Sequence, residues 1–137
     1  PLFFANSDQF VEWDSNEFMY KMNETNADGG IVTFEATHPK WSFAKINKQG
    51  LVTEVAEKKP ISNIATVGFY YWKQGSDFVK YAEQMINKNI RVNNEFYVCP
   101  VFNQAIQDGK QIRTFNIGGM WGLGTPEDLN YYLENFK

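Results

Sequence analysis

The chain has 137 residues, a net charge of −3 and a single cysteine, Cys99. That length suits one domain, residues 1–137, while the acidic balance excludes polymeric nucleic acid as a partner and the single cysteine excludes an internal disulfide. No apolar run reaches the ~18 residues of a membrane span and no signal peptide is found, so we expect no membrane partner and a cytoplasmic location.

An apolar run opens the chain and ends in the polar residues Asn6, Ser7 and Asp8. We interpret it as a buried strand that delivers Asp8 to its carboxyl end, where open α/β sheets place their sites. Because no turn or cap precedes this strand, the sequence predicts that an N-terminal half of the fold is missing from the polypeptide.

Strand and helix patterns alternate along the rest of the chain. Asp14 or Ser15 is expected to cap a short helix. The elements predicted after it are strand 31–36, a hairpin of strands 41–46 and 51–55, strand 64–72, a helix capped by Ser76, helix 95–106, strand 111–117 and a helix capped by Thr125. The buried face of the Ser76 helix is predicted to hold Phe78, Val79, Ala82, Met85 and Ile86. This order predicts an α/β domain with a mixed sheet.

Four segments carry a resemblance to a known family. They are residues 5–9, residues 55–70 with Glu57-Lys58 followed by Ser62-Asn63 and Gly68, residues 94–97, and residues 119–129 with the run Gly-Thr-Pro-Glu-Asp-Leu. Together they cover nearly the whole chain and resemble the sugar-1-phosphate nucleotidyltransferases, the pyrophosphorylases that make nucleotide sugars. The similarity is strongest to the subgroup associated with capsule and surface-polysaccharide clusters.

This resemblance implies a mixed-sheet, Rossmann-like GT-A nucleotidyltransferase fold. It also implies a reaction that joins an NTP to a sugar-1-phosphate, or a related phospho-compound, to give a nucleotide sugar and pyrophosphate. The family's glycine-rich nucleotide loop would precede the Asp8 strand and has no counterpart in the sequence. The chain would then be the C-terminal, sugar-phosphate-binding portion of such an enzyme, inactive alone, with sugar phosphate and nucleotide as partners.

Two other functions stay open at this point. A non-catalytic sugar-phosphate-binding module of the same fold would not need the nucleotide loop. A GT-A glycosyltransferase would normally carry an Asp-x-Asp pair, whereas Asn6-Ser7-Asp8 offers one carboxylate.

Asp8 is the expected metal ligand and a catalytic residue. The resemblance implies that it binds the Mg²⁺ that bridges the phosphates, since two phosphate-bearing reactants cannot approach until their charge is offset. The plain alternative is that Asp8 caps a turn. The family's second metal-binding Asp corresponds to Gly122, which has no side chain to offer. Either water and phosphates complete the metal shell, or another carboxylate such as Asp14 enters, or the chain does not catalyse.

Glu57 and Lys58 are the expected sugar-phosphate ligands. The resemblance implies that Glu57 accepts hydrogen bonds from sugar hydroxyls and that Lys58 binds the phosphate and assists catalysis. The alternative is an ordinary solvated charged loop. Asn63 and Gly68 belong to the same signature, and a glycine inside a bulky strand indicates close approach of a ligand or another backbone.

Three further residues are expected to bind substrate by the same resemblance: Trp41, Ser42 and Glu95. Ser42 replaces a glycine that lets backbone donors meet the sugar, so the choice of sugar could differ. Trp41 is equally explained as a core or interface aromatic, and Glu95 as a helix cap.

Two other features have structural interpretations. Helix capping explains the run Thr125–Asp128, which we do not interpret as catalytic. The aromatic residues Tyr70, Tyr71, Trp72, Tyr131 and Tyr132 form either the interface of a homo-oligomer or a cover for an exposed sheet.

Overall fold

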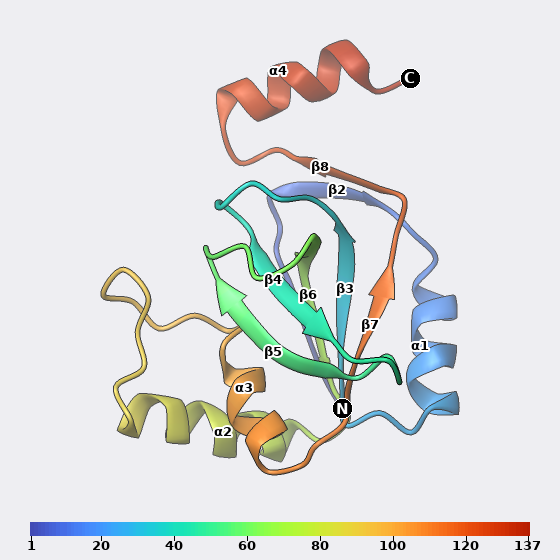
Figure 1. Ribbon diagram of the computed structural model, residues 1–137. Coiled ribbons are helices and arrows are strands. Elements are labelled where there is room, and N and C mark those ends of the chain that lie inside the picture. The colour runs from blue at the N-terminus through green and yellow to red at the C-terminus, as the bar shows by residue number, and fades with distance from the viewer.

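A six-stranded sheet forms the centre of the computed structural model, which describes residues 1–137 (Figure 1). Its strands follow the order β5 (Val52–Glu57), β4 (Ser42–Ile46), β6 (Ile64–Trp72), β3 (Gly29–Glu35) and β7 (Ile112–Asn116), with β1 (Leu2–Ala5) beside β6. Strands β3 and β7 are parallel, and the other neighbours are antiparallel. The predicted mixed sheet is therefore confirmed.

Strand β6 is the most central element because three strands pair with it. Strand β3 lies along one edge, while β4 and β1 share the other edge, β4 at Ala65 and β1 at residues 69–72. Its sequence, rich in Val, Phe, Tyr and Trp, suits a strand buried on both faces. Tyr70, Tyr71 and Trp72 are at most 6% exposed, so these three aromatic residues belong to the core and not to an interface.

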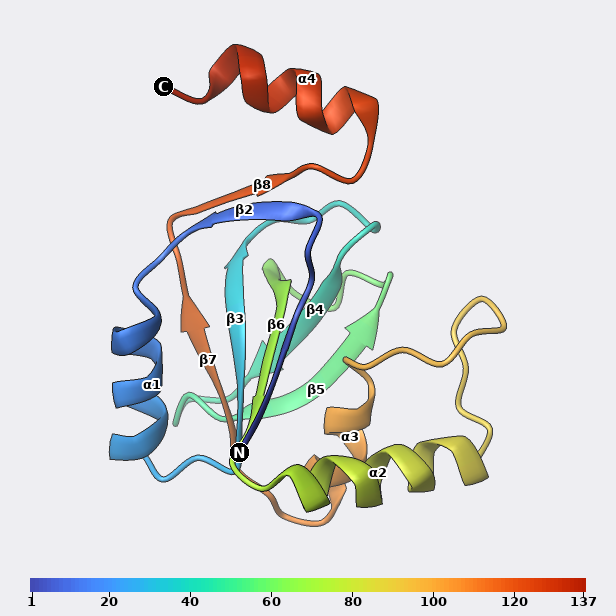
Figure 2. The ribbon, with the colours of Figure 1, turned by 180° about the vertical axis from the view of Figure 1, so that it is seen from behind.

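Helices cover both faces of the sheet (Figure 2). Helix α1 (Ser15–Glu24) buries Phe18 and Met22 against one face, and Asp14 caps it by accepting a hydrogen bond from the Asn16 N–H group. Helices α2 (Gly75–Asn87) and α3 (Val101–Gln107) cover the other face. None of the chain's helices is long and apolar enough to cross a membrane.

A two-stranded antiparallel sheet lies above the carboxyl end of β3 and carries the last helix (Figure 1). Its strands are β2 (Gln9–Glu12) and β8 (Gly119–Gly122), and helix α4 (Pro126–Asn135) follows. We call β2 and β8 the ribbon. Phe10 and Trp121 of the ribbon pack with Tyr132 and Phe136, so aromatic contacts hold α4 in place. The sequence did not predict the ribbon, because strands of four residues are too short to show a recognisable alternation of apolar and polar side chains.

The opening strand corrects one expectation. Strand β1 is not buried: its residues alternate between half-buried and exposed, and Phe3 is 43% exposed. The reason is that β1 pairs on one edge with β6 and lies at the margin of the sheet.

Two helix predictions were also wrong in part. In α2 the buried residues are Tyr81 and Met85, while Val79 and Ile86 are exposed, and Gln74 rather than Ser76 stands at the N-cap. The helix predicted over 95–106 begins only at Val101, because a proline at position 100 disfavours helical backbone at the residue before it. Glu95 lies in a turn and pairs with Val92, so it caps no helix.

Gly30 of β3 offers a test of how tightly α1 packs on the sheet. An alanine Cβ at residue 30 would collide with Met22 Sδ and lie 3.0 Å from Phe18 Cζ, and both side chains are buried. We expect Gly30→Ala to lower the free energy of unfolding by about 1–3 kcal/mol in urea titrations, as overpacked core sites do.

The matched control is Gly118→Ala, because a Cβ at residue 118 would meet no atom within 4 Å. Its free energy of unfolding should change by no more than about 0.5 kcal/mol. Equal losses in both variants would contradict the packing argument.

Candidate functional site

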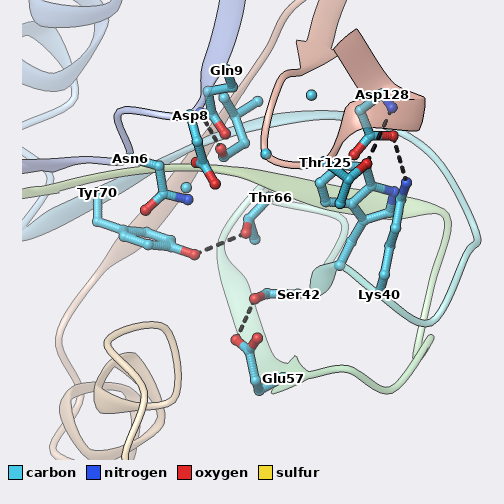
Figure 3. Close-up of a pocket in the computed structure, with 15 residues that line it drawn as sticks. Asn6, Asp8, Gln9, Lys40, Ser42, Glu57, Thr66, Tyr70, Thr125 and Asp128 are labelled. Atoms are coloured by element: carbon cyan, nitrogen blue, oxygen red, sulfur yellow. Dashed lines mark hydrogen bonds and ion pairs between the residues drawn. The ribbon is translucent and has the colours of Figure 1, made fainter. Parts of the chain in front are cut away.

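A cavity of about 310 Å³ lies where the central sheet, the ribbon and the start of α4 meet. Figure 3 shows the side chains that line it. Five residues expected from the sequence to bind substrate or metal contribute to this lining: Asp8, Trp41, Ser42, Glu57 and Gly68. The fold therefore gathers at one place residues that are up to 60 positions apart in the sequence.

Gly68 creates the bend on which this cavity depends. Between the pairs Ile31–Tyr70 and Thr33–Thr66, β6 uses more residues than β3, so β6 bulges around Gly68. Gly68 has a φ of 92°, a conformation that favours glycine, and an added Cβ would collide with the Asn6 amide. The close approach expected at Gly68 is thus made by a neighbouring side chain.

The bulge also positions Asp8. The Asn6 N–H group donates to the Gly68 carbonyl at 3.3 Å, and the Gln9 side-chain amide donates to the Val67 carbonyl. These two bonds hold the turn on both sides of Asp8. Glycine at residue 124 then makes room for the carboxylate, since a Cβ there would lie 2.7 Å from Asp8 Oδ2.

The Asp8 carboxylate itself remains available for a ligand. None of the chain's salt bridges involves it, whereas its backbone carbonyl accepts a hydrogen bond from the Leu123 N–H group at 2.8 Å. The backbone of Asp8 therefore joins the ribbon to the Gly122–Gly124 turn, and the side chain lines the cavity.

Hydroxyl and carboxylate groups form a polar wall across the cavity. Ser42 and Glu57 face each other on β4 and β5, and the Ser42 hydroxyl donates to Glu57 Oε2. Nearby, the buried hydroxyls of Thr66 and Tyr70 are hydrogen-bonded at 2.9 Å (Figure 3). Such a wall can both donate and accept hydrogen bonds, as a hydroxylated ligand requires.

Burial raises the pKa values of two groups in this wall. It raises the pKa of Glu57 above its ordinary value, although the hydrogen bond from Ser42 and the charge of Lys58 act in the opposite direction. Burial also raises the pKa of Tyr70 well above its ordinary value, so this hydroxyl keeps its proton.

Three expected site residues, Lys58, Asn63 and Glu95, lie outside the cavity lining. Lys58 Nζ donates to the Tyr97 hydroxyl at 2.8 Å and lies 4.9 Å from the centre of that ring. That hydrogen bond raises the pKa of Lys58, and the negative charge of Glu95 contributes in the same direction. Asn63 lines a smaller cavity of about 210 Å³ beside Thr33.

The cavity also contains residues that sequence reasoning missed, above all Lys40 and Asp128. Thr125 caps α4 as predicted, accepting from the Asp128 N–H group at 3.1 Å, yet both side chains also line the cavity. Asp128 lies beside Gly122, since a Cβ at residue 122 would be 3.5 Å from Asp128 Oδ2. Asp128 is the third residue after the cap, and its side chain points back toward the Gly122–Gly124 turn that precedes α4.

Asp14 does not enter this cavity. Its carboxylate caps α1, where it accepts from the Asn16 N–H group at 2.8 Å. The carboxylate that stands next to Gly122 is instead that of Asp128.

Comparisons with known proteins place this site in a known fold. The solved nucleoside-diphosphate-sugar pyrophosphorylase from Vibrio cholerae RC9 matches 93% of this chain with a TM-score of 0.76 and 25% identity. The chain has the fold of the nucleotide-sugar pyrophosphorylases. The match covers 53% of the Vibrio cholerae chain, so this chain spans about half the length of that protein. No protein-family model and no curated protein matches the sequence.

Two further nucleotide-sugar pyrophosphorylase structures show the same fold at lower identity. A candidate glucose-1-phosphate thymidylyltransferase from Bacillus anthracis, solved with sucrose, has a TM-score of 0.69 at 17% identity and covers 90% of this chain and 49% of its own. A UDP-glucose pyrophosphorylase from Acinetobacter baumannii has a TM-score of 0.66 at 16% identity, covering 95% and 50%. The fold class predicted from the sequence is confirmed.

The raised pKa of Glu57 predicts a pH-dependent stability in this pyrophosphorylase fold. The folded chain holds the Glu57 proton more tightly than the unfolded chain does. Below the ordinary pKa of 4.5 Glu57 is protonated in both states and its ionisation costs no stability. Above that pH the unfolded chain ionises more readily, so the free energy of unfolding falls as the pH rises. Glu57→Gln removes that cost. The free energy of unfolding of Glu57→Gln relative to the parent should therefore rise between about pH 4 and about pH 7 in urea titrations.

Glu54→Gln, at an exposed position on the same strand, is the matched control. A pH dependence of the same size in both variants, or a constant difference for Glu57→Gln, would contradict the assigned burial effect.

Proposed function

We propose that this chain binds a sugar-1-phosphate as part of a nucleotidyltransferase that joins the sugar phosphate to an NTP and releases pyrophosphate. The observation that carries the proposal is the cavity, which brings together Asp8, Ser42 and Glu57 with Trp41 and Gly68. These are residues that the resemblance assigned to sugar and metal, and the solved nucleotide-sugar pyrophosphorylases support the same conclusion.

The cavity wall suits a sugar ring. Glu57 is half-buried and can accept hydrogen bonds from two hydroxyls, while Ser42 and Thr66 add short polar groups. Trp41 supplies an apolar surface and is held in place by an edge contact with Phe34, with ring centres 5.3 Å apart. Polar groups beside an aromatic face are typical of a specific small-molecule site.

Mg²⁺ is the cofactor that we propose for this site. Mg²⁺ takes oxygen ligands and is usually bound by one or two carboxylates, with water and substrate phosphates completing its shell. Asp8 and Asp128 both line the cavity. Nowhere in the chain do three or more His, Cys, Asp or Glu side chains gather in a group that could hold a metal ion. This donor set fits Mg²⁺, so Asp8 and Asp128 would hold it. Bound there, it offsets the negative charge of the phosphates.

The reaction needs no covalent intermediate with the protein. An oxygen of the sugar phosphate attacks the α-phosphorus of the NTP in line, a new P–O bond forms, and the bond to the β-phosphate breaks to release pyrophosphate. The chain's own residues would orient the acceptor: Glu57 holds the sugar hydroxyls, and the cavity fixes the direction of the phosphate.

The finer parts of the proposal rest on the resemblance. The nucleotide sugar would serve surface-polysaccharide synthesis, as in the capsule-type subgroup, and the reaction would take place in the cytoplasm, where nucleoside triphosphates are abundant. Self-association is also proposed, because the exposed side chains of Leu129, Tyr131 and Leu133 give α4 an apolar surface.

A second candidate is a non-catalytic sugar-phosphate-binding module of the same fold. Gly122 favours it, because glycine leaves the expected second metal position without a side chain of its own. Asp128 beside Gly122 favours the transferase.

Glu57→Gln tests the sugar site. Isothermal titration of the chain with a panel of hexose 1-phosphates should give saturable binding in the parent. We expect binding to weaken at least about tenfold in Glu57→Gln, because hydrogen bonds to charged groups contribute about 1.5–3 kcal/mol. Glu54→Gln should bind like the parent. Absence of binding in the parent, or equal loss in both variants, would refute the proposed function.

Asp8→Asn tests the metal proposal without measuring activity. Electron paramagnetic resonance of free Mn²⁺, titrated into the chain with a saturating hexose 1-phosphate, should show an affinity at least about tenfold lower for Asp8→Asn than for the parent. Glu12→Gln, at the far end of the strand that follows Asp8 and outside the cavity, is the control. Unchanged Mn²⁺ affinity in Asp8→Asn would exclude Asp8 as a ligand.

A further inference from the structure

The cavity contains one basic residue. Of the fifteen residues that line it, only Lys40 carries a positive charge, whereas Asp8, Glu57 and Asp128 carry carboxylates. A phosphate group placed in this cavity therefore has a single side-chain cation to meet.

Two contacts orient the Lys40 side chain. Its Nζ lies 4.7 Å from the centre of the Trp41 ring and 3.8 Å from Asp128 Oδ1. Figure 3 shows Lys40 beside Asp128, and both residues line the cavity together with Ser42 and Glu57. The Lys40 backbone is fixed as well, since its N–H group donates to His38 Nδ1 at 3.1 Å.

The contact with Asp128 is easily exchanged for a ligand. At 3.8 Å it is a loose ion pair, and the two side chains are 48% and 34% exposed. Exposed pairs of this kind contribute about 0–1 kcal/mol, so a phosphate dianion can replace Asp128 at little cost. Lys40 is therefore ordered but free to bind.

Lys58, the lysine assigned to the phosphate by the resemblance, has a different environment. Its Nζ is bonded to the Tyr97 hydroxyl at 2.8 Å and lies over the same ring, outside the cavity lining. To reach the cavity, Lys58 would have to give up both contacts.

We propose that Lys40 binds the phosphate group of the sugar phosphate, as a second cation beside the Lys58 that the resemblance implies. This assignment rests on the proposed function. Glu57 would hold the sugar hydroxyls, Lys40 would hold the phosphate, and the Trp41 ring next to Lys40 would contact the sugar between them.

The test is isothermal titration, without divalent cation, of the hexose 1-phosphate that the parent chain binds most tightly. Lys40→Gln should lose at least about tenfold in affinity, as expected for a charge-assisted hydrogen bond to phosphate. Lys40→Arg, which keeps the charge, should retain most of the affinity. Lys45→Gln, which changes an exposed lysine on β4, should change affinity by less than about fivefold.

The outcomes separate the two proposals. Unchanged affinity in Lys40→Gln overturns the Lys40 assignment and leaves the sugar-phosphate function standing. Equal losses in Lys40→Gln and Lys45→Gln also overturn the assignment, because they indicate a general effect of net charge. No binding by the parent overturns the proposed function and the assignment with it.

Discussion

The bulge of β6 at Gly68 is the constraint on which the site depends. Gly68 adopts a positive φ where β6 bulges, and the carbonyl groups of Val67 and Gly68 there accept hydrogen bonds from the turn that carries Asp8. The bond from the Asn6 N–H group extends the β1–β6 pairing by one residue, and the bond from the Gln9 side chain holds the far side of the turn. The bulge at Gly68 thus anchors the turn that places the Asp8 side chain in the cavity.

The rest of the cavity follows from how the ribbon and α4 attach to the sheet. Helix α4 has no buried residue and is held by the aromatic contacts around Trp121. Its first turn nevertheless reaches the cavity through Thr125 and Asp128. One wall of the site therefore belongs to the central sheet, and the opposite wall belongs to an element with few contacts of its own. Local openings of α4 would change that wall first.

Sequence patterns predicted the elements with strong local signals. The alternation of the β4–β5 hairpin, the β-branched and aromatic run of β6, and the Thr-Pro-Glu-Asp start of α4 all correspond to the observed structure. The ribbon could not be predicted, because its two strands are four residues each and pair across more than a hundred positions. The α2 face was misassigned because helical spacing alone did not show that Tyr81, and not Val79, faces the core.

The candidate site shows the same division. Asp8, Ser42 and Glu57 stand in recognisable motifs, so the sequence alone indicated them. Lys40 and Asp128 belong to the His-Pro-Lys turn and to a helix cap, each of which has a sufficient local explanation. Only the tertiary contact between the β3–β4 loop and the first turn of α4 makes them neighbours. Lys58 stands in the same motif as Glu57, but its Nζ is hydrogen-bonded to the Tyr97 hydroxyl outside the cavity lining, so its role stays a prediction.

The charge balance of the cavity has a consequence for the order in which ligands arrive. Three carboxylates and one ammonium group surround a small volume, so an anion that enters alone meets net repulsion. A divalent cation and a phosphate would each remove part of the other's electrostatic cost. If a phosphate bound Lys40, Asp128 would lose its counter-charge and would become a better ligand for a cation. Binding of the two would then be mutually reinforcing, with each raising the affinity for the other by the same factor.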